Sequence, residues 1–98
     1  MSLMLDRMQC GKLEEAEDFY RQSLEIARKV GNRPGEAQTL WAMALLAEQQ
    51  GDVGLAVERM EKAVGMFEEM GMAEAGRARG VLERLRKRLE EEQGGPKS

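Results

Sequence analysis

An internal repeat constrains the fold of this chain more than any other feature of its sequence. The segment GDVGLAVERMEKAVGMFEEMG, residues 51–71, has a counterpart in GKLEEAEDFYRQSLEIARKVG, residues 11–31. At an offset of forty residues the glycines at both ends coincide, Ala16 coincides with Ala56, and most other apolar positions stay apolar. A repeat of this length indicates an array of similar units that bury their apolar faces against one another.

Apolar residues recur at spacings of three and four along most of the chain, which predicts amphipathic helices. We place the helices at residues 12–30, 35–50, 53–70 and 73–92. A glycine follows each of the first three, as is usual where helices end. The helix 35–50 is apolar on nearly every side in its middle, so we expect it between its neighbours. The helix 73–92 has one narrow apolar stripe on a charged surface, which suits a terminal cap.

The two ends of the chain are expected to differ from the repeats. At the same offset, residues 1–10 align with the second half of the helix 35–50, so we expect a truncated first helix there. Three apolar residues would form its buried side: Leu3, Met4 and Met8. Residues 93–98 are expected to form a disordered tail. Residues 1–92 then form a single all-α domain, an antiparallel helix-hairpin repeat.

The composition excludes several classes of function. The 98 residues include one cysteine and no histidine, so an intramolecular disulfide is ruled out and the usual metal sites and acid–base catalysts lack their commonest ligand. A formal net charge of −3 gives no global attraction to nucleic acid or to an anionic membrane. No apolar run approaches the roughly 20 residues that span a bilayer. We expect a cytoplasmic protein that is not an enzyme and binds no metal or cofactor.

Residues 44–71, ALLAEQQGDVGLAVERMEKAVGMFEEMG, combine a helix end, a glycine turn and a helix with alanines seven residues apart. In these features the chain resembles tetratricopeptide repeats, in a longer variant whose period matches the offset of forty residues. The resemblance covers residues 11–92 and implies a superhelix of about two repeats with a C-terminal capping helix. It also implies a close helix contact at Ala16 and Ala56, and a non-catalytic scaffold for a protein or peptide partner.

In this family the first helix of each pair lines the concave face of the superhelix, where a peptide or partner helix binds. The matching positions here are Gln38, Trp41, Ala42, Leu45, Glu48 and Gln49. Trp41 has two interpretations. It is either an apolar anchor for the partner, of the residue type enriched in binding hot spots, or a core residue.

A second hypothesis concerns self-association. The helix 12–30 needs a full first helix against it, and residues 1–10 supply only about half of one. Apolar surface would then stay exposed around three residues: Phe19, Tyr20 and Ala27. Exposed apolar patches favour association, so a symmetric homodimer would cover this one, or a preceding repeat would do so in a longer protein.

A third hypothesis concerns the basic run in the last helix. Six cations lie close together: Arg77, Arg79, Arg84, Arg86, Lys87 and Arg88. Such a run can contact an anionic ligand or nucleic acid. The sequence favours a solvated surface instead, because residues 90–92 are glutamates and no aromatic residue is interleaved for base stacking.

Overall fold

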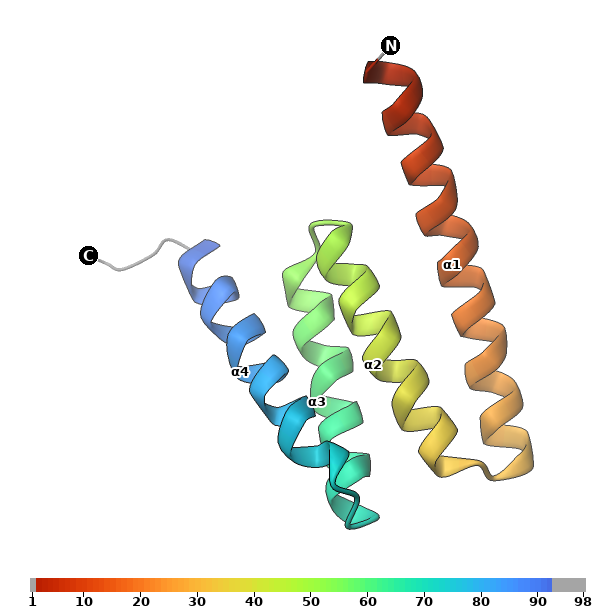
Figure 1. Cartoon of the computed structure of the whole chain (residues 1–98), viewed down its shortest axis with the longest axis vertical. Helices are drawn as coiled ribbons and strands as arrows, with labels where there is room; N and C mark the ends of the chain where they lie inside the picture. The colour runs from red at the N-terminus through yellow and green to blue at the C-terminus, as the bar shows by residue number, and fades with distance from the viewer. Residues whose placement is uncertain (1, 93–98) are drawn as a thin grey trace.

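The computed structural model describes residues 2–92, with side chains from Leu13 to Glu92. In this range the chain forms four helices: α1 (Ser2–Val30), α2 (Arg33–Gln49), α3 (Val53–Glu69) and α4 (Glu74–Glu92). Each helix packs against the next and runs in the opposite direction, so α2 and α3 each have neighbours on two sides (Figure 1). The predicted all-α fold of antiparallel helix hairpins is confirmed.

Three turns of the same kind join the helices. Each contains a glycine in the left-handed region, with φ of 75° at Gly31, 88° at Gly51 and 67° at Gly71. Glycine adopts this conformation without the steric cost that a Cβ atom adds. In the middle turn the N–H of Asp52 donates to the carbonyl of Ala47 at 2.9 Å, which satisfies a carbonyl group at the end of α2. The glycines that the sequence marks as helix ends therefore reverse the chain.

Side-chain caps then start the next helices. The Oδ1 atom of Asn32 accepts a hydrogen bond from the N–H of Gly35 at 3.1 Å, in the first turn of α2. The Oδ1 atom of Asp52 accepts one from the N–H of Leu55 at 3.1 Å, in the first turn of α3. Both bonds satisfy N–H groups that have no partner within the helix. Each of these two turns thus combines a glycine that ends one helix with a polar residue that begins the next.

The N-terminal part of the chain differs from the prediction. The sequence predicts a break at Gly11 between a truncated helix and the helix 12–30, but α1 runs without interruption from Ser2 to Val30. One glycine inside a helix costs only about 1 kcal/mol relative to alanine, and residues 2–10 are too short to form a stable separate helix. Continuing the helix is therefore favoured over a turn. The burial expected for Leu3, Met4 and Met8 and the tail expected at 93–98 lie outside the described residues.

The hydrophobic core lies between α2, α3 and α4. Its largest fully buried side chains are Phe67, Met60, Leu85 and Val53. Helix α2 buries most of its middle, as its apolar surface predicts, through six residues: Ala37, Leu40, Met43, Ala44, Leu46 and Ala47. Helix α4 buries only one stripe, formed by Ala78, Leu82 and Leu85. The remaining surface of α4 faces solvent and carries most of its charged residues.

Candidate protein-binding surface

An apolar hollow lies between α1 and α2. It has a volume of about 300 Å³, and seven residues line it: Leu13, Ala16 and Tyr20 from α1, and Ala42, Leu45, Leu46 and Gln49 from α2. Three of the six positions predicted for the concave face, Ala42, Leu45 and Gln49, therefore lie together at this hollow. Leu45 is 36% exposed, which is high for a large apolar side chain beside a core.

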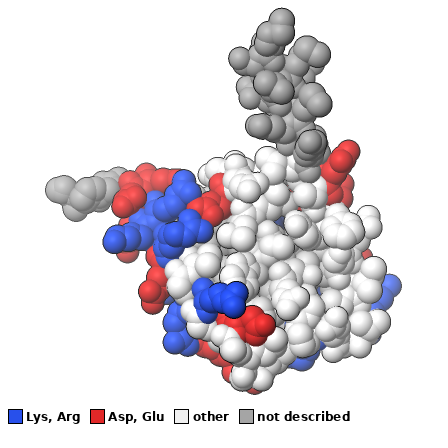
Figure 2. Space-filling view, viewed as in Figure 1, with Lys and Arg blue, Asp and Glu red and all other residues white. Residues whose placement is uncertain are grey.

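The surface around the hollow carries few charges. Figure 2 shows a broad area over α2 and the adjoining part of α1 that is largely free of lysine, arginine, aspartate and glutamate. Charged residues gather instead over α4, at the left of the same view. The seven lining residues are all uncharged. This face therefore suits an apolar or neutral binding partner rather than an anion.

The hollow exists because neighbouring helices bury the second copy of the repeat more completely than the first. In the second copy Ala56 and Met60 are 0% exposed and Val53 is 2% exposed. Their equivalents in the first copy stay partly exposed: Ala16, Tyr20 and Leu13. Helix α3 packs against both α2 and α4, whereas α1 packs mainly against α2. The same apolar pattern is thus buried in one copy and open in the other.

Trp41 lies partly in the core and partly at the surface. Its ring meets the ring of Phe67 edge to face, with centroids 5.9 Å apart and an interplanar angle of 77°. Such a pair stabilises a protein by about 0.5–1.5 kcal/mol beyond the burial of its area. The core interpretation accounts for this contact, while the exposed part of the indole stays accessible to a partner. Gln38 is exposed on α2 and does not line the hollow.

Comparison with known protein families adds to this geometry. The family model for the tetratricopeptide repeat matches residues 5–69, which is more than half of the chain. The chain belongs to the tetratricopeptide-repeat family. No match was found among curated proteins or among solved structures.

Membership of the tetratricopeptide-repeat family gives each helix a place in a repeat. The match includes most of α1 and all of α2 and α3. Tetratricopeptide repeats mediate protein–protein interactions and are typically non-catalytic scaffolds. Within residues 2–92, none of the helices is both long enough and apolar enough to cross a membrane.

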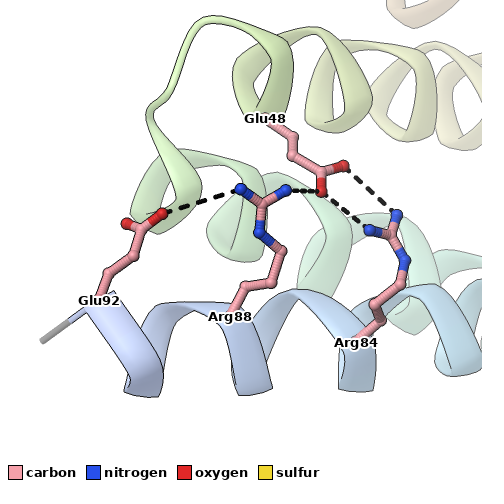
Figure 3. A network of polar contacts seen from close by, with 4 residues as sticks. All are labelled: Glu48, Arg84, Arg88 and Glu92. Carbon is pink, nitrogen blue, oxygen red and sulfur yellow. Dashed lines mark hydrogen bonds and ion pairs between the residues drawn. The ribbon is translucent and has the colours of Figure 1, made fainter. Parts of the chain in front are cut away.

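Glu48, another residue predicted for the concave face of the tetratricopeptide repeats, is held by α4. Its carboxylate accepts hydrogen bonds from Arg84 at 2.8 and 3.3 Å and from Arg88 at 2.6 Å (Figure 3). The hydrogen bond from Arg84, reinforced by Arg88, holds the pKa of Glu48 below its ordinary value of 4.5. Only 12% of the Glu48 side chain is exposed. Glu48 therefore links α2 to α4 through ion pairs, and its carboxylate is not free to bind a partner.

We expect the substitution Glu48→Gln to lower the free energy of unfolding by about 1 kcal/mol at neutral pH, because it weakens two charge-assisted hydrogen bonds. The folded-state pKa is depressed, so the unfolded chain binds the proton first as the pH falls. The contribution of Glu48 to the free energy of unfolding is fully present above pH 4.5, and it is lost as the pH falls through the folded-state pKa of Glu48. Urea denaturation at neutral and acid pH should show the difference between variant and wild type shrinking in acid.

Glu61→Gln is the matched control for this substitution. Glu61 pairs with Arg86 at 2.8 Å, but its side chain is 47% exposed and it meets one arginine rather than two. Removing the charge of Glu61 should lower the free energy of unfolding by less than about 0.5 kcal/mol, as is typical of exposed ion pairs. A Glu48→Gln effect that is no larger than the control, or that is the same at both pH values, would contradict this role.

The three residues predicted for self-association do not all share one exposed patch. Phe19 is 65% exposed, and its ring lies edge to face with that of Tyr20 at 5.8 Å. Ala27 is only 7% exposed, so its expected exposure is wrong. It lies in the last turn of α1, where its carbonyl accepts a hydrogen bond from the N–H of Asn32 and the chain folds back toward α2. The open apolar surface of α1 around Phe19 and Tyr20 therefore does not extend to Ala27.

The basic run of α4 is largely paired with carboxylates. Four of its six cations form ion pairs: Arg79 with Glu68, Arg84 and Arg88 with Glu48, and Arg86 with Glu61. The partners come from α2 and α3, so these arginines help to hold the cap on the repeat. A charge that is already paired is less available to a phosphate, which weighs against the anionic-ligand hypothesis. The sequence does not identify these pairs, because it does not specify how the facing helices are rotated.

Proposed function

We propose that this chain is a non-catalytic scaffold that binds a peptide or a partner helix on its concave face, in the cytoplasm. The observation that carries the proposal is the apolar hollow between α1 and α2, which brings Ala42, Leu45 and Gln49 together within an uncharged surface. The role of the family in protein–protein interaction supports the same proposal.

The chemistry of the hollow defines the kind of ligand. A volume of about 300 Å³ lies at the lower end of the range for ligand pockets, so it accommodates a few apolar side chains rather than a large cofactor. An amphipathic helix presents such side chains at positions i, i+3 and i+4. Gln49 at the edge of the hollow and exposed Gln38 on the same helix offer amide groups for polar contacts beside that apolar stripe.

Selection of a displayed peptide library on the full chain tests this proposal. We expect the enriched peptides to carry apolar residues at helical spacing and few charges. The substitution Leu45→Glu should weaken their binding at least about tenfold, which corresponds to about 1.4 kcal/mol, because it places a charge at the mouth of an apolar hollow.

Ile26→Glu is the matched control for Leu45→Glu. Ile26 is also an exposed apolar residue, at 61% exposure, but it lies on α1 outside the hollow. This variant should bind the selected peptides like the wild type, and both variants should keep the helical circular dichroism spectrum. Peptides that bind the Leu45→Glu variant as tightly as the wild type would rule out the hollow as the binding site.

A further inference from the structure

Helix α1 leaves one of its sides partly open. Ala16, Tyr20 and Ser23 follow one another at spacings of four and three residues, so they lie on one side of α1 together with Leu13. All four side chains are partly exposed. We call these four residues the open face of α1. This face includes the α1 side of the hollow and is about three helical turns long.

The second copy of the repeat shows how the same face is covered elsewhere in the chain. At the offset of forty residues the open face aligns with Val53, Ala56, Met60 and Ala63 of α3. Val53 is 2% exposed and the other three are 0% exposed. None of the aligned pairs exchanges an apolar residue for a charged one. The difference in burial therefore comes from the neighbouring helices rather than from the side chains themselves.

The order of the helices identifies the neighbour that α1 lacks. Helix α3 packs against the helix before it, α2, and against the helix after it, α4. Helix α1 packs mainly against the helix after it and stands at the end of the row of described helices (Figure 1). The missing neighbour of α1 is therefore the counterpart of α2.

We propose that the open face of α1 binds a helix of the α2 type from a partner protein, seated in the hollow and antiparallel to α1. The inference rests on the proposed function, because it names the kind of partner for the same surface. Residues 37–47 of α2 include no charged residue, and the buried residues of α2 are all alanine, leucine or methionine. A helix with this pattern matches the uncharged lining of the hollow.

A helix of the α4 type does not match this site. Helix α4 carries charged residues along its whole length, including Glu83 and Arg84 in its middle. Its arginines pair with carboxylates of α2 and α3, such as Glu48 and Glu61. The residues that line the hollow offer no charged group to such a helix, and a charge buried without a partner is costly. The contact side of the partner helix should therefore be uncharged.

Small residues set how closely the partner helix can approach. Ala16 and Ser23 lie seven residues apart, as Ala56 and Ala63 do in α3. Both alanines of α3 are 0% exposed, so they are covered directly by neighbouring atoms. The distance between packed helices depends on the side chains at the contact. A larger residue at position 16 should therefore hold the partner helix away from α1.

A synthetic peptide with the sequence of residues 32–50 tests the proposal, because it contains the whole of α2. We expect isothermal titration calorimetry of this peptide with the full 98-residue chain to give a Kd of about 1–100 µM, since the peptide must fold on binding. A peptide with the same residues, in an order that removes the helical spacing of the apolar positions, should not bind. A lack of binding by the α2 peptide overturns the proposal.

The variant Ala16→Leu tests the close approach of the two helices. It should weaken binding of the α2 peptide at least about tenfold by overpacking the contact, while the free energy of unfolding stays nearly unchanged, because Ala16 lies at an open hollow. Gln22→Leu is the matched control. Gln22 is exposed on α1 and aligns with Lys62, which is exposed on α3, so this variant should bind like the wild type. Equal affinities for both variants overturn the proposal.

A nitroxide at the C-terminal end of the α2 peptide reports the direction of the bound helix. In the antiparallel arrangement this end lies beside the start of the open face, as the end of α2 lies next to the start of α3. The amide signal of Leu13 should therefore broaden more than that of Leu24 in nuclear magnetic resonance spectra. Stronger broadening at Leu24 overturns the proposed arrangement.

Two further outcomes separate this inference from the proposed function. Library peptides that depend on Leu45, but bind the Ala16→Leu variant as tightly as the wild type, would refute an α2-type helix and leave the proposed function standing. Sedimentation of the wild type as a dimer, and of the Ala16→Leu variant as a monomer, would place a second copy of the chain on the open face of α1. That result would overturn the partner helix.

Discussion

The substitution Phe67→Ala is expected to lower the free energy of unfolding by about 3–5 kcal/mol. Phe67 is 0% exposed, belongs to the core between α2, α3 and α4, and packs against the ring of Trp41. Removing its ring deletes a large apolar area and leaves a cavity that the neighbouring helices fill only in part. A domain of this size has roughly 5–15 kcal/mol of stability, so the variant should lose a large share of it. Urea denaturation followed by circular dichroism measures the loss.

The chain offers a matched control, because it has only two phenylalanines. Phe19 is 65% exposed and lies on α1, so Phe19→Ala should change the free energy of unfolding by less than about 0.5 kcal/mol. Both variants lose the same atoms, and only their surroundings differ. Similar losses for the two variants would contradict the placement of the core between α2, α3 and α4.

Much of this fold could be predicted from local signals in the sequence. Gly31, Gly51 and Gly71 end helices because the turn needs a positive φ, which depends on the residue itself rather than on distant contacts. Asn32 and Asp52 cap the following helices for a similarly local reason. The apolar spacing of α3 also predicts its buried side, because a helix surrounded by neighbours must bury its apolar stripe.

Gly11 shows where local signals are insufficient. It occupies the same repeat position as Gly51, yet it lies within a helix. The difference comes from the surroundings, since a turn at Gly51 brings the full length of α2 against α3, while a turn at Gly11 would bring only residues 2–10 against α1. The apolar surface that a turn would bury decides between the two conformations, and the identity of one residue does not specify that surface.

Glu48 shows a second limit, which concerns the candidate site. The family pattern places it on the concave face, but the structure pairs it with Arg84 and Arg88. The sequence does contain one indication of this pairing. Arg84 and Arg88 lie four residues apart, on one side of α4, and the facing helix α2 carries only two acidic residues. Which of those two residues faces α4 depends on how the helices are rotated about their axes, and the sequence does not specify that rotation.

A second substantial loss of stability is expected at the close contact between paired helices. Ala56→Leu should lower the free energy of unfolding by about 1–3 kcal/mol, because Ala56 is 0% exposed in the core and the added carbons have no space there. Ala16→Leu makes the same change at the equivalent position of the first copy. Ala16 lines the open hollow, so the leucine side chain finds room there and the stability should stay nearly unchanged.

These two alanine variants measure how the two copies of the repeat differ. The close-contact alanine is buried in α3 and lies at an open hollow in α1. Urea denaturation of Ala16→Leu and Ala56→Leu at the same protein concentration measures the free energy of unfolding of each variant. We expect Ala56→Leu to lose at least about 1 kcal/mol more of the free energy of unfolding than Ala16→Leu. Equal losses at the two positions would show that Ala16 is as tightly packed as Ala56, and would contradict an open first copy.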